Sequence, residues 1–167
     1  MAERQERTAP DAVLTRIGQV VMLHHAGDRE EARRRLLDLW AEIGEHGEPL
    51  HRCTLAHYLA DTQDDPSDEL AWDLRALSAA DEAEGAAALR GFYPSLHLNL
   101  AADYVKLGRA EAARTHLHRA RGAATEALGD DGYGDGVRAA ISRLELRLGD
   151  DDTPDGDSWG PPRQRPK

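Results

Sequence analysis

The chain has 167 residues and a net charge of -10, with 31% charged, 40% hydrophobic and only 5% aromatic residues. That length is enough for one domain with its own core, and the few aromatics require a core of leucine, alanine, valine and isoleucine. The acidic balance argues against nucleic acid as the main ligand, because it would repel phosphates. It favours a monomer or a small homo-oligomer.

The chain carries no sign of export or of a membrane. A single cysteine, Cys53, excludes an internal disulfide framework. The opening residues MAERQERTAPDAV lack the apolar core of a secretion signal, and no apolar run approaches the ~20 residues needed to span a bilayer. We therefore expect a cytoplasmic protein that does not contact a membrane.

Composition and periodicity predict an all-α fold. Alanine, leucine, arginine and glutamate, all strong helix formers, dominate, and no run alternates with the period of a strand. Apolar stripes and turn residues predict helices over residues 10–27, 29–43, 50–62, 67–79, 94–107, 110–128 and 137–148. Residues 80–92 fit either a short helix or an extension of the helix before them. Residues 1–9 and 149–167 are polar, and we expect disordered ends around a domain spanning 10–148.

Local signals set the expected helix ends. Ser67 is placed as an N-cap, with Asp68 and Glu69 in the first turn. Gly108 marks a tight turn, and GDDGYGDG (129–136) is expected to form a loop.

The sequence contains an internal repeat. The window LHHAGDREEARRRLLDL (23–39) aligns with YVKLGRAEAARTHLHRA (104–120), each with a helix end, a tight turn and a second helix. The aligned pairs are Gly27 with Gly108, Glu30 with Glu111, Ala32 with Ala113, Arg33 with Arg114, and Leu36 with Leu117. In both copies a small and a large residue stand four apart, on one helix face.

Residues 97–120 resemble the tetratricopeptide repeat family. The matching positions are His97-x2-Leu100-Ala101-x2-Tyr104, the turn at Gly108, Ala113-x3-Leu117, and the final small residue Ala120. Partial copies occupy 14–40 and 51–77, so the resemblance covers about residues 11–128 and suggests a small bacterial protein of this kind. It implies a right-handed α-solenoid of about three antiparallel helix hairpins plus a C-terminal capping helix.

The resemblance also implies a binding surface. In such stacks the first helix of each hairpin lines a concave groove that takes a peptide. Superposition of the repeats places these residues in the groove: Ile17, Val21, His24, His25, Leu50, Cys53, His57, Ala60, Asp61, Leu98, Asn99, Ala102, Val105 and Lys106. The polar and sulfur-bearing members are the candidate contacts: His24, His25, Cys53, His57, Asp61, Asn99 and Lys106. The expected function is protein or peptide binding, with no enzymatic activity, no catalytic residue and no cofactor.

Cys53 and His57 stand four residues apart on one helix face, with His51 near the start of that helix. Together with His24 and His25 they could supply soft-metal ligands, which would make the chain a metal- or ligand-sensing regulatory module. The spacing contains no paired cysteines, so we favour a buried structural thiol beside partly exposed histidines. Asp61 could orient His57 for catalysis, but neighbours on one helix rarely achieve that geometry.

Other suggestive segments are expected to be structural. The stretches 130–136 and 152–157 are rich in aspartate but lack the acidic residue at the twelfth position of an EF-hand. The arginines at 33–35 belong to a helix face with Glu30, Glu31 and Asp38 rather than to a nucleic-acid patch. We expect His116 and His118 to be solvated and Trp159 to be an isolated tail residue. A small regulator that caps a larger complex remains a further possibility.

Overall fold

The computed structural model describes residues 11–83 and 86–152, and within these ranges all regular structure is α-helical. The helices are α1 (Ala12–His25), α2 (Arg29–Ile43), α3 (Pro49–Asp61), α4 (Pro66–Glu82), α5 (Ala87–Arg90), α6 (Tyr93–Lys106), α7 (Ala110–Ala127) and α8 (Gly132–Asp152). The all-α prediction is therefore confirmed for the described part of the chain. The predicted ends at 1–9, and Trp159 with the rest of the tail from residue 153, lie outside it.

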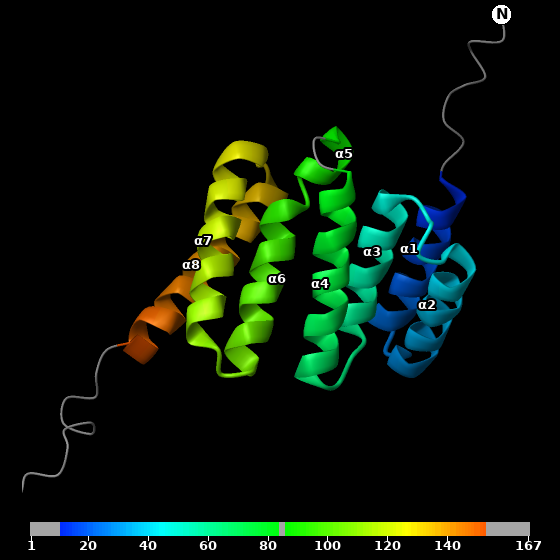
Figure 1. Cartoon of the computed structure of the whole chain (residues 1–167), viewed down its shortest axis with the longest axis horizontal. Helices are drawn as coiled ribbons and strands as arrows, with labels where there is room; N and C mark the ends of the chain where they lie inside the picture. The colour runs from blue at the N-terminus through cyan, green and yellow to red at the C-terminus, as the bar shows by residue number, and fades with distance from the viewer. Residues whose placement is uncertain (1–10, 84–85, 153–167) are drawn as a thin grey trace, which may run out of the picture.

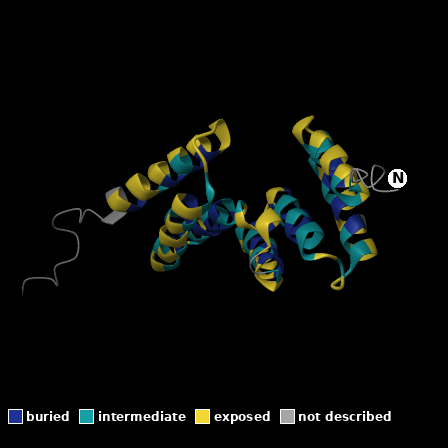
Figure 2. Ribbon diagram, turned by 90° about the horizontal axis from the view of Figure 1, so that it is seen from above, coloured by how far each residue is buried: buried dark blue, intermediate teal, exposed yellow. Residues whose placement is uncertain are grey.

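The long helices stand side by side in one row, from α1 and α2 at one end to α7 and α8 at the other (Figure 1). Helices joined by short turns pack directly on each other, α1 on α2, α3 on α4 and α6 on α7. Further contacts join these pairs through α2 with α3, α4 with α6, and α7 with α8. Seen from above, the two ends of the row bend toward the same side (Figure 2).

The two turns that the repeat aligns close in the same way. Gly27 and Gly108 have φ of 100° and 72°, values that glycine adopts without the penalty a Cβ would bring. Gly27 N–H donates to the carbonyl of His24 (3.0 Å), and Gly108 N–H donates to that of Val105 (3.0 Å). In each turn the next amide donates five residues back, which completes a Schellman motif. The internal repeat therefore extends to backbone geometry.

Aspartates set the helix starts. The Asp11 carboxylate accepts from the amides of Val13 and Leu14 and caps α1. The predicted cap at Ser67 is wrong, because the Asp65 carboxylate caps α4 and Pro66 occupies its first position. Proline suits that position, since its missing N–H would have no helical partner there.

The last helix is longer than predicted, because a cap lies inside the expected loop. Asp131 accepts from Gly134 N–H through its carboxylate (2.7 Å) and from Asp135 N–H through its carbonyl (2.9 Å). Arg138 then donates to the carbonyls of Leu128 and Gly129, which ties α8 back to the end of α7. The helix also continues to Asp152, so residues 149–152, which were predicted to belong to the tail, are helical.

The ambiguous stretch 80–92 contains parts of both alternatives. α4 runs on to Glu82, beyond the predicted end at 79, and α5 is a separate short helix that buries Leu89. α6 then begins at Tyr93, with Pro94 in its first turn.

The core consists of three apolar clusters along the row. The first holds Ile17, Val20, Ala32, Leu36, Leu39, Leu55 and Leu59; the second Cys53, Ala56, Ala76, Ala79, Ala80, Leu89 and Leu96; the third Ala101, Ala113, Leu117, Ala120, Ala124, Val137, Ile141 and Leu148. Ile17, placed in the groove by the repeat, is 1% exposed and belongs to the core. Trp40 and Trp72 meet edge to face, 5.1 Å apart, where the first two clusters adjoin.

The outer face of α2 carries the arginines of the RRR run in ion pairs. Arg33 pairs with Glu30, and Arg34 and Arg35 both pair with Glu31, at the three- and four-residue spacings that bring side chains together on a helix surface. None of the described helices has an apolar stretch long enough to cross a membrane.

Candidate functional site

A pocket of about 270 Å³ opens between α3 and α6, and four of the predicted groove residues line it. We call it the groove pocket. Its lining residues are Cys53, Thr54, His57 and Tyr58 from α3, Phe92, Ser95, Leu96, Leu98 and Asn99 at and along α6, and Tyr133 from α8. Of the seven candidate contacts, the structure brings Cys53, His57 and Asn99 together at this pocket, although His57 and Asn99 lie 42 residues apart in sequence.

The pocket is mostly apolar with two polar pairs. Nδ2 of Asn99 lies 3.1 Å from Nδ1 of His57, which joins α6 to α3 across the pocket. The hydroxyls of Ser95 and Tyr133 lie 2.8 Å apart. Phe92 and Tyr133 are 37% and 55% exposed, unusually open for aromatic side chains beside a cavity. The wall therefore offers apolar contact area with a few fixed polar groups.

Cys53 is a packed thiol. It is 2% exposed and belongs to an apolar core cluster, and burial raises its pKa to about 11. A thiol with that pKa is almost entirely protonated near neutral pH, which disfavours both nucleophilic attack and metal ligation.

The histidines near Cys53 do not gather around it. Nε2 of His51 lies 2.5 Å from the Asp11 carboxylate and 3.8 Å from Glu48. In the described part of the chain, two groups of three side chains place potential ligand atoms within 4.8 Å of one another: Asp11 with Glu48 and His51, and Glu69 with Asp73 and Asp103. Neither group includes Cys53 or His57, so the candidate set of His51, Cys53 and His57 does not form a cluster.

The remaining groove candidates lie toward the other end of α3 and α6. The rings of His24 and His25 at the end of α1 are 5.9 Å apart, and both lie within electrostatic reach of Asp61. Nζ of Lys106 donates to both carboxylate oxygens of Glu69, each at 3.0 Å. Lys106 is thus already held by α4, rather than free to clamp a ligand.

Sequence reasoning missed a buried group of carboxylates between α4 and α6. We call Glu69, Asp73, Asp103 and Lys106 the acidic junction. Asp73 is 3% exposed and Asp103 fully buried. Burial raises the pKa of Asp73 to about 10, with a further rise from neighbouring Asp103, and burial likewise raises the pKa of Asp103 to about 7.

A signal for this group was present in the sequence. Asp103 follows Leu96 and Leu100 at spacings of seven and three, and Asp73 precedes Ala76 and Ala80 at spacings of three and seven. These spacings place both aspartates on the buried stripes of their helices, where an aspartate is rare unless it has a partner.

The prediction of a solvated His116 is wrong. Its Nδ1 lies 3.1 Å from Nδ1 of His97, and its ring stacks with those of His97 and Tyr104. His97 is 9% exposed, and burial followed by the nearby His116 and Arg119 lowers its pKa to about 4. The pair joins α6 to α7 as a neutral hydrogen-bonded contact. His118 is exposed, as predicted.

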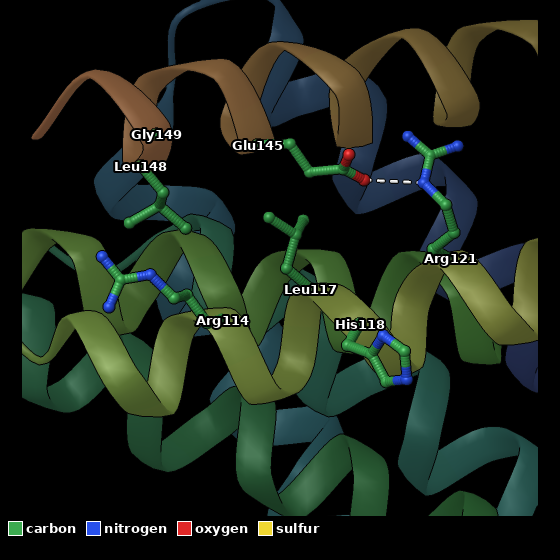
Figure 3. Close-up of a pocket in the computed structure, with 7 residues that line it drawn as sticks. All are labelled: Arg114, Leu117, His118, Arg121, Glu145, Leu148 and Gly149. Carbon is green, nitrogen blue, oxygen red and sulfur yellow. Dashed lines mark hydrogen bonds and ion pairs between the residues drawn. The ribbon is translucent and has the colours of Figure 1, made fainter. Parts of the chain in front are cut away.

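A second cavity, of about 350 Å³, lies between α7 and α8 (Figure 3). Leu117 from α7 and Leu148 from α8 form its apolar lining from opposite sides, and Arg121 reaches across to Glu145, 2.6 Å away. Arg121 also donates to Ser142 (3.0 Å). Its guanidinium is therefore committed to holding α8 on α7, and the groove pocket is the better candidate for a binding site.

No family model, curated protein or solved structure matches the chain. The resemblance to tetratricopeptide repeats stays a prediction, resting on the quoted motif and on the internal repeat.

Proposed function

We propose that this chain is a right-handed α-solenoid of three antiparallel helix hairpins, capped by α8, that binds a peptide segment of another protein in the groove pocket. The observation that carries the proposal is the convergence of Cys53, His57 and Asn99 on one pocket. The resemblance to tetratricopeptide repeats selects the same three residues independently of the pocket, because it implies that the first helix of each hairpin faces the ligand.

The lining favours an apolar anchor. Leu96, Leu98 and Tyr58 offer apolar walls, while the exposed rings of Phe92 and Tyr133 add contact area at the rim. Large apolar or aromatic side chains that enter such pockets typically dominate the affinity of a peptide. The hydrogen-bonded pair His57–Asn99 would then fix the position of the peptide backbone along the groove.

The charge of the chain favours a neutral or basic peptide. The net charge of -10 attracts cationic partners and repels acidic ones. Catalysis finds little support here, since the thiol of Cys53 is buried with a raised pKa, and the His57 ring is oriented by an amide rather than by a carboxylate.

Selection from a displayed library of random linear peptides, followed by calorimetric titration of the enriched peptides, tests this proposal. We expect enriched sequences to share a large apolar residue, and His57→Glu and Asn99→Ala each to weaken binding at least tenfold. His46→Glu makes the same change of charge at an exposed position in the 44–48 turn, and should bind as the unchanged chain does. Enriched peptides whose affinity is insensitive to both groove variants would refute the assignment.

A further inference from the structure

The acidic junction brings three carboxylates from two helices to one point. Glu69 and Asp73 stand one turn apart on α4, and Asp103 faces them from α6. One oxygen of each lies within 4.8 Å of the others, close enough for a single ion to contact all three.

The two aspartates have more unsatisfied oxygens than a shared proton can satisfy. Oδ1 of Asp73 and both oxygens of Asp103 are buried without a hydrogen-bond partner. A proton shared between two carboxyl groups satisfies one oxygen of each, hence at most two of these three. The third oxygen would need a second proton on Asp103, donated toward Glu69, whose two oxygens both already accept from the ammonium of Lys106. Buried polar atoms without partners are costly and uncommon.

The carboxylates of the acidic junction outnumber its single positive charge. With all three carboxylates ionised, the group and its one lysine would carry a charge of -2, and its two aspartates are almost completely buried. Asp61 at the end of α3 adds further negative potential to Asp73. A divalent cation or two bound protons would neutralise the group, whereas a monovalent ion or a single proton would leave an uncompensated buried charge.

We propose that the acidic junction binds one hard divalent cation of the Mg²⁺, Mn²⁺ or Ca²⁺ class between α4 and α6. Carboxylate oxygens are the ligands such ions prefer. The ion takes the oxygens of Asp73 and Asp103 that have no other partner, and Lys106 holds Glu69 in place beside them. Its effect is to join α4 to α6 through a charged bridge. This inference is independent of peptide binding.

Calorimetric titration of the full, chelator-treated chain with MnCl₂, MgCl₂ and CaCl₂ at pH 8 tests the site. We expect one ion per chain for at least one of the three salts. A cation at about a hundred times its Kd should lower the unfolding equilibrium constant about a hundredfold, raising Tm by roughly 5–10 °C. Binding should release protons, because the ion replaces the proton that Asp73 and Asp103 share in its absence.

Matched variants locate the ion. Asp103→Asn should abolish binding, while Glu48→Gln, in the other carboxylate group of the described chain, should leave it unchanged. Lys106→Gln should bind at least tenfold more tightly, because it removes the competing cation, and it keeps the test decisive if Asp103→Asn does not fold. The absence of binding and of a Tm shift with all three salts would overturn the proposal, as would binding that survives Asp103→Asn.

Discussion

Two junctions in the row of helices are held by opposite means. Where α1 and α2 meet α3, the buried residues are large and aliphatic, among them Ile17, Leu36, Leu55 and Leu59; we call this the apolar junction. Where α4 meets α6, the chain instead buries the carboxylates of the acidic junction beside small alanines. The apolar contact depends on area removed from water, and the acidic contact on protonation and counter-ions.

The difference separates two kinds of stability within one fold. Burial of aliphatic side chains is insensitive to pH, so the apolar junction should hold equally well across the range in which proteins are usually studied. The acidic junction should tighten or weaken with pH and with cations. Substitutions in the apolar junction and in the acidic junction should therefore change the free energy of unfolding by different amounts and with a different dependence on pH.

Truncation in the apolar junction should be the most damaging change. Leu36 is 1% exposed and its neighbour Leu37 is 42% exposed, so the two positions differ mainly in burial. Leu36→Ala should lower the free energy of unfolding by about 2–5 kcal/mol, through lost burial and a residual cavity. Leu37→Ala should cost well under about 1 kcal/mol.

Urea unfolding of both variants at pH 5 and pH 8 measures this comparison. The loss in Leu36→Ala should be the same at the two pH values. A loss that changed with pH, or equal losses for the two variants, would contradict the description of the apolar junction.

The acidic junction should weaken as pH rises. The folded-state pKa values of Asp73 and Asp103 lie above those of the unfolded chain, at about 10 and about 7. The folded state therefore keeps protons that the unfolded chain releases above about pH 4. This contribution is complete below about pH 4 and declines as pH rises through 7 toward 10, with a slope of up to about 1.4 kcal/mol per pH unit for each proton.

Asp73→Asn should flatten that decline, because asparagine can donate to Asp103 at every pH. Chemical unfolding in chelator between pH 5 and 9 measures the slope, and Asp68→Asn, an exposed position on the same helix, provides the control. If the free energy of unfolding falls with pH equally steeply in the unchanged chain and in Asp73→Asn, the acidic junction does not control the pH dependence.

The helices and turns could be predicted from the sequence, whereas the caps could not. Apolar stripes and turn glycines have local periods, so the helices, the equivalence of Gly27 with Gly108 and the buried Leu36 followed from the pattern alone. Asp65 and Asp131 were missed as caps because Ser67 and several aspartates competed for the same role nearby. The choice among them depends on backbone angles that are set by the whole turn.

The candidate site was predicted only in part, for the same reason. The resemblance and the repeat placed Cys53, His57 and Asn99 along one groove, since equivalent positions of equivalent helices share a face, but they did not single out the pocket where these three meet. The aromatic rim could not be foreseen, because Tyr133 reaches the pocket from α8, whose start was predicted several residues later. The pairing of Asp73 with Asp103 depends on the contact of α4 with α6, which no local period encodes.

The contact between α6 and α7 should respond to pH in the opposite direction and weaken in acid. The folded-state pKa of His97 is lowered to about 4 by burial, then by His116 and Arg119, with Asp81 acting in the opposite direction. Between about pH 6.5 and pH 4, His97 is therefore protonated in the unfolded chain but neutral in the folded chain. Stability should be complete above about pH 6.5 and fall toward pH 4, over a narrower range than at the acidic junction.

His97→Gln should remove this acid-sensitive component, and His118→Gln, an exposed histidine on α7, should not. Thermal unfolding at pH 4.5, 5.5 and 6.5 gives the comparison. If both variants lose stability in acid as steeply as the unchanged chain, the buried histidine pair does not control the acid response.

The smallest expected effects come from single glycines, and they test whether the turn geometry of the repeat matters. Gly108 has a φ of 72°, while Gly122 lies exposed inside α7, where a Cβ would meet nothing beyond its own helix within 4 Å. Gly108→Ala should therefore cost about 1–2 kcal/mol, because a Cβ is strained in the left-handed region. Gly122→Ala should stabilise the chain by roughly 0.5–1 kcal/mol, because alanine is the better helix former. Urea unfolding distinguishes the two by sign, and a stabilising Gly108→Ala would mean that this turn can relax to another conformation.

Because Gly27 closes its turn with the same hydrogen bonds, Gly27→Ala should match Gly108→Ala if the two copies of the repeat are energetically as well as geometrically equivalent.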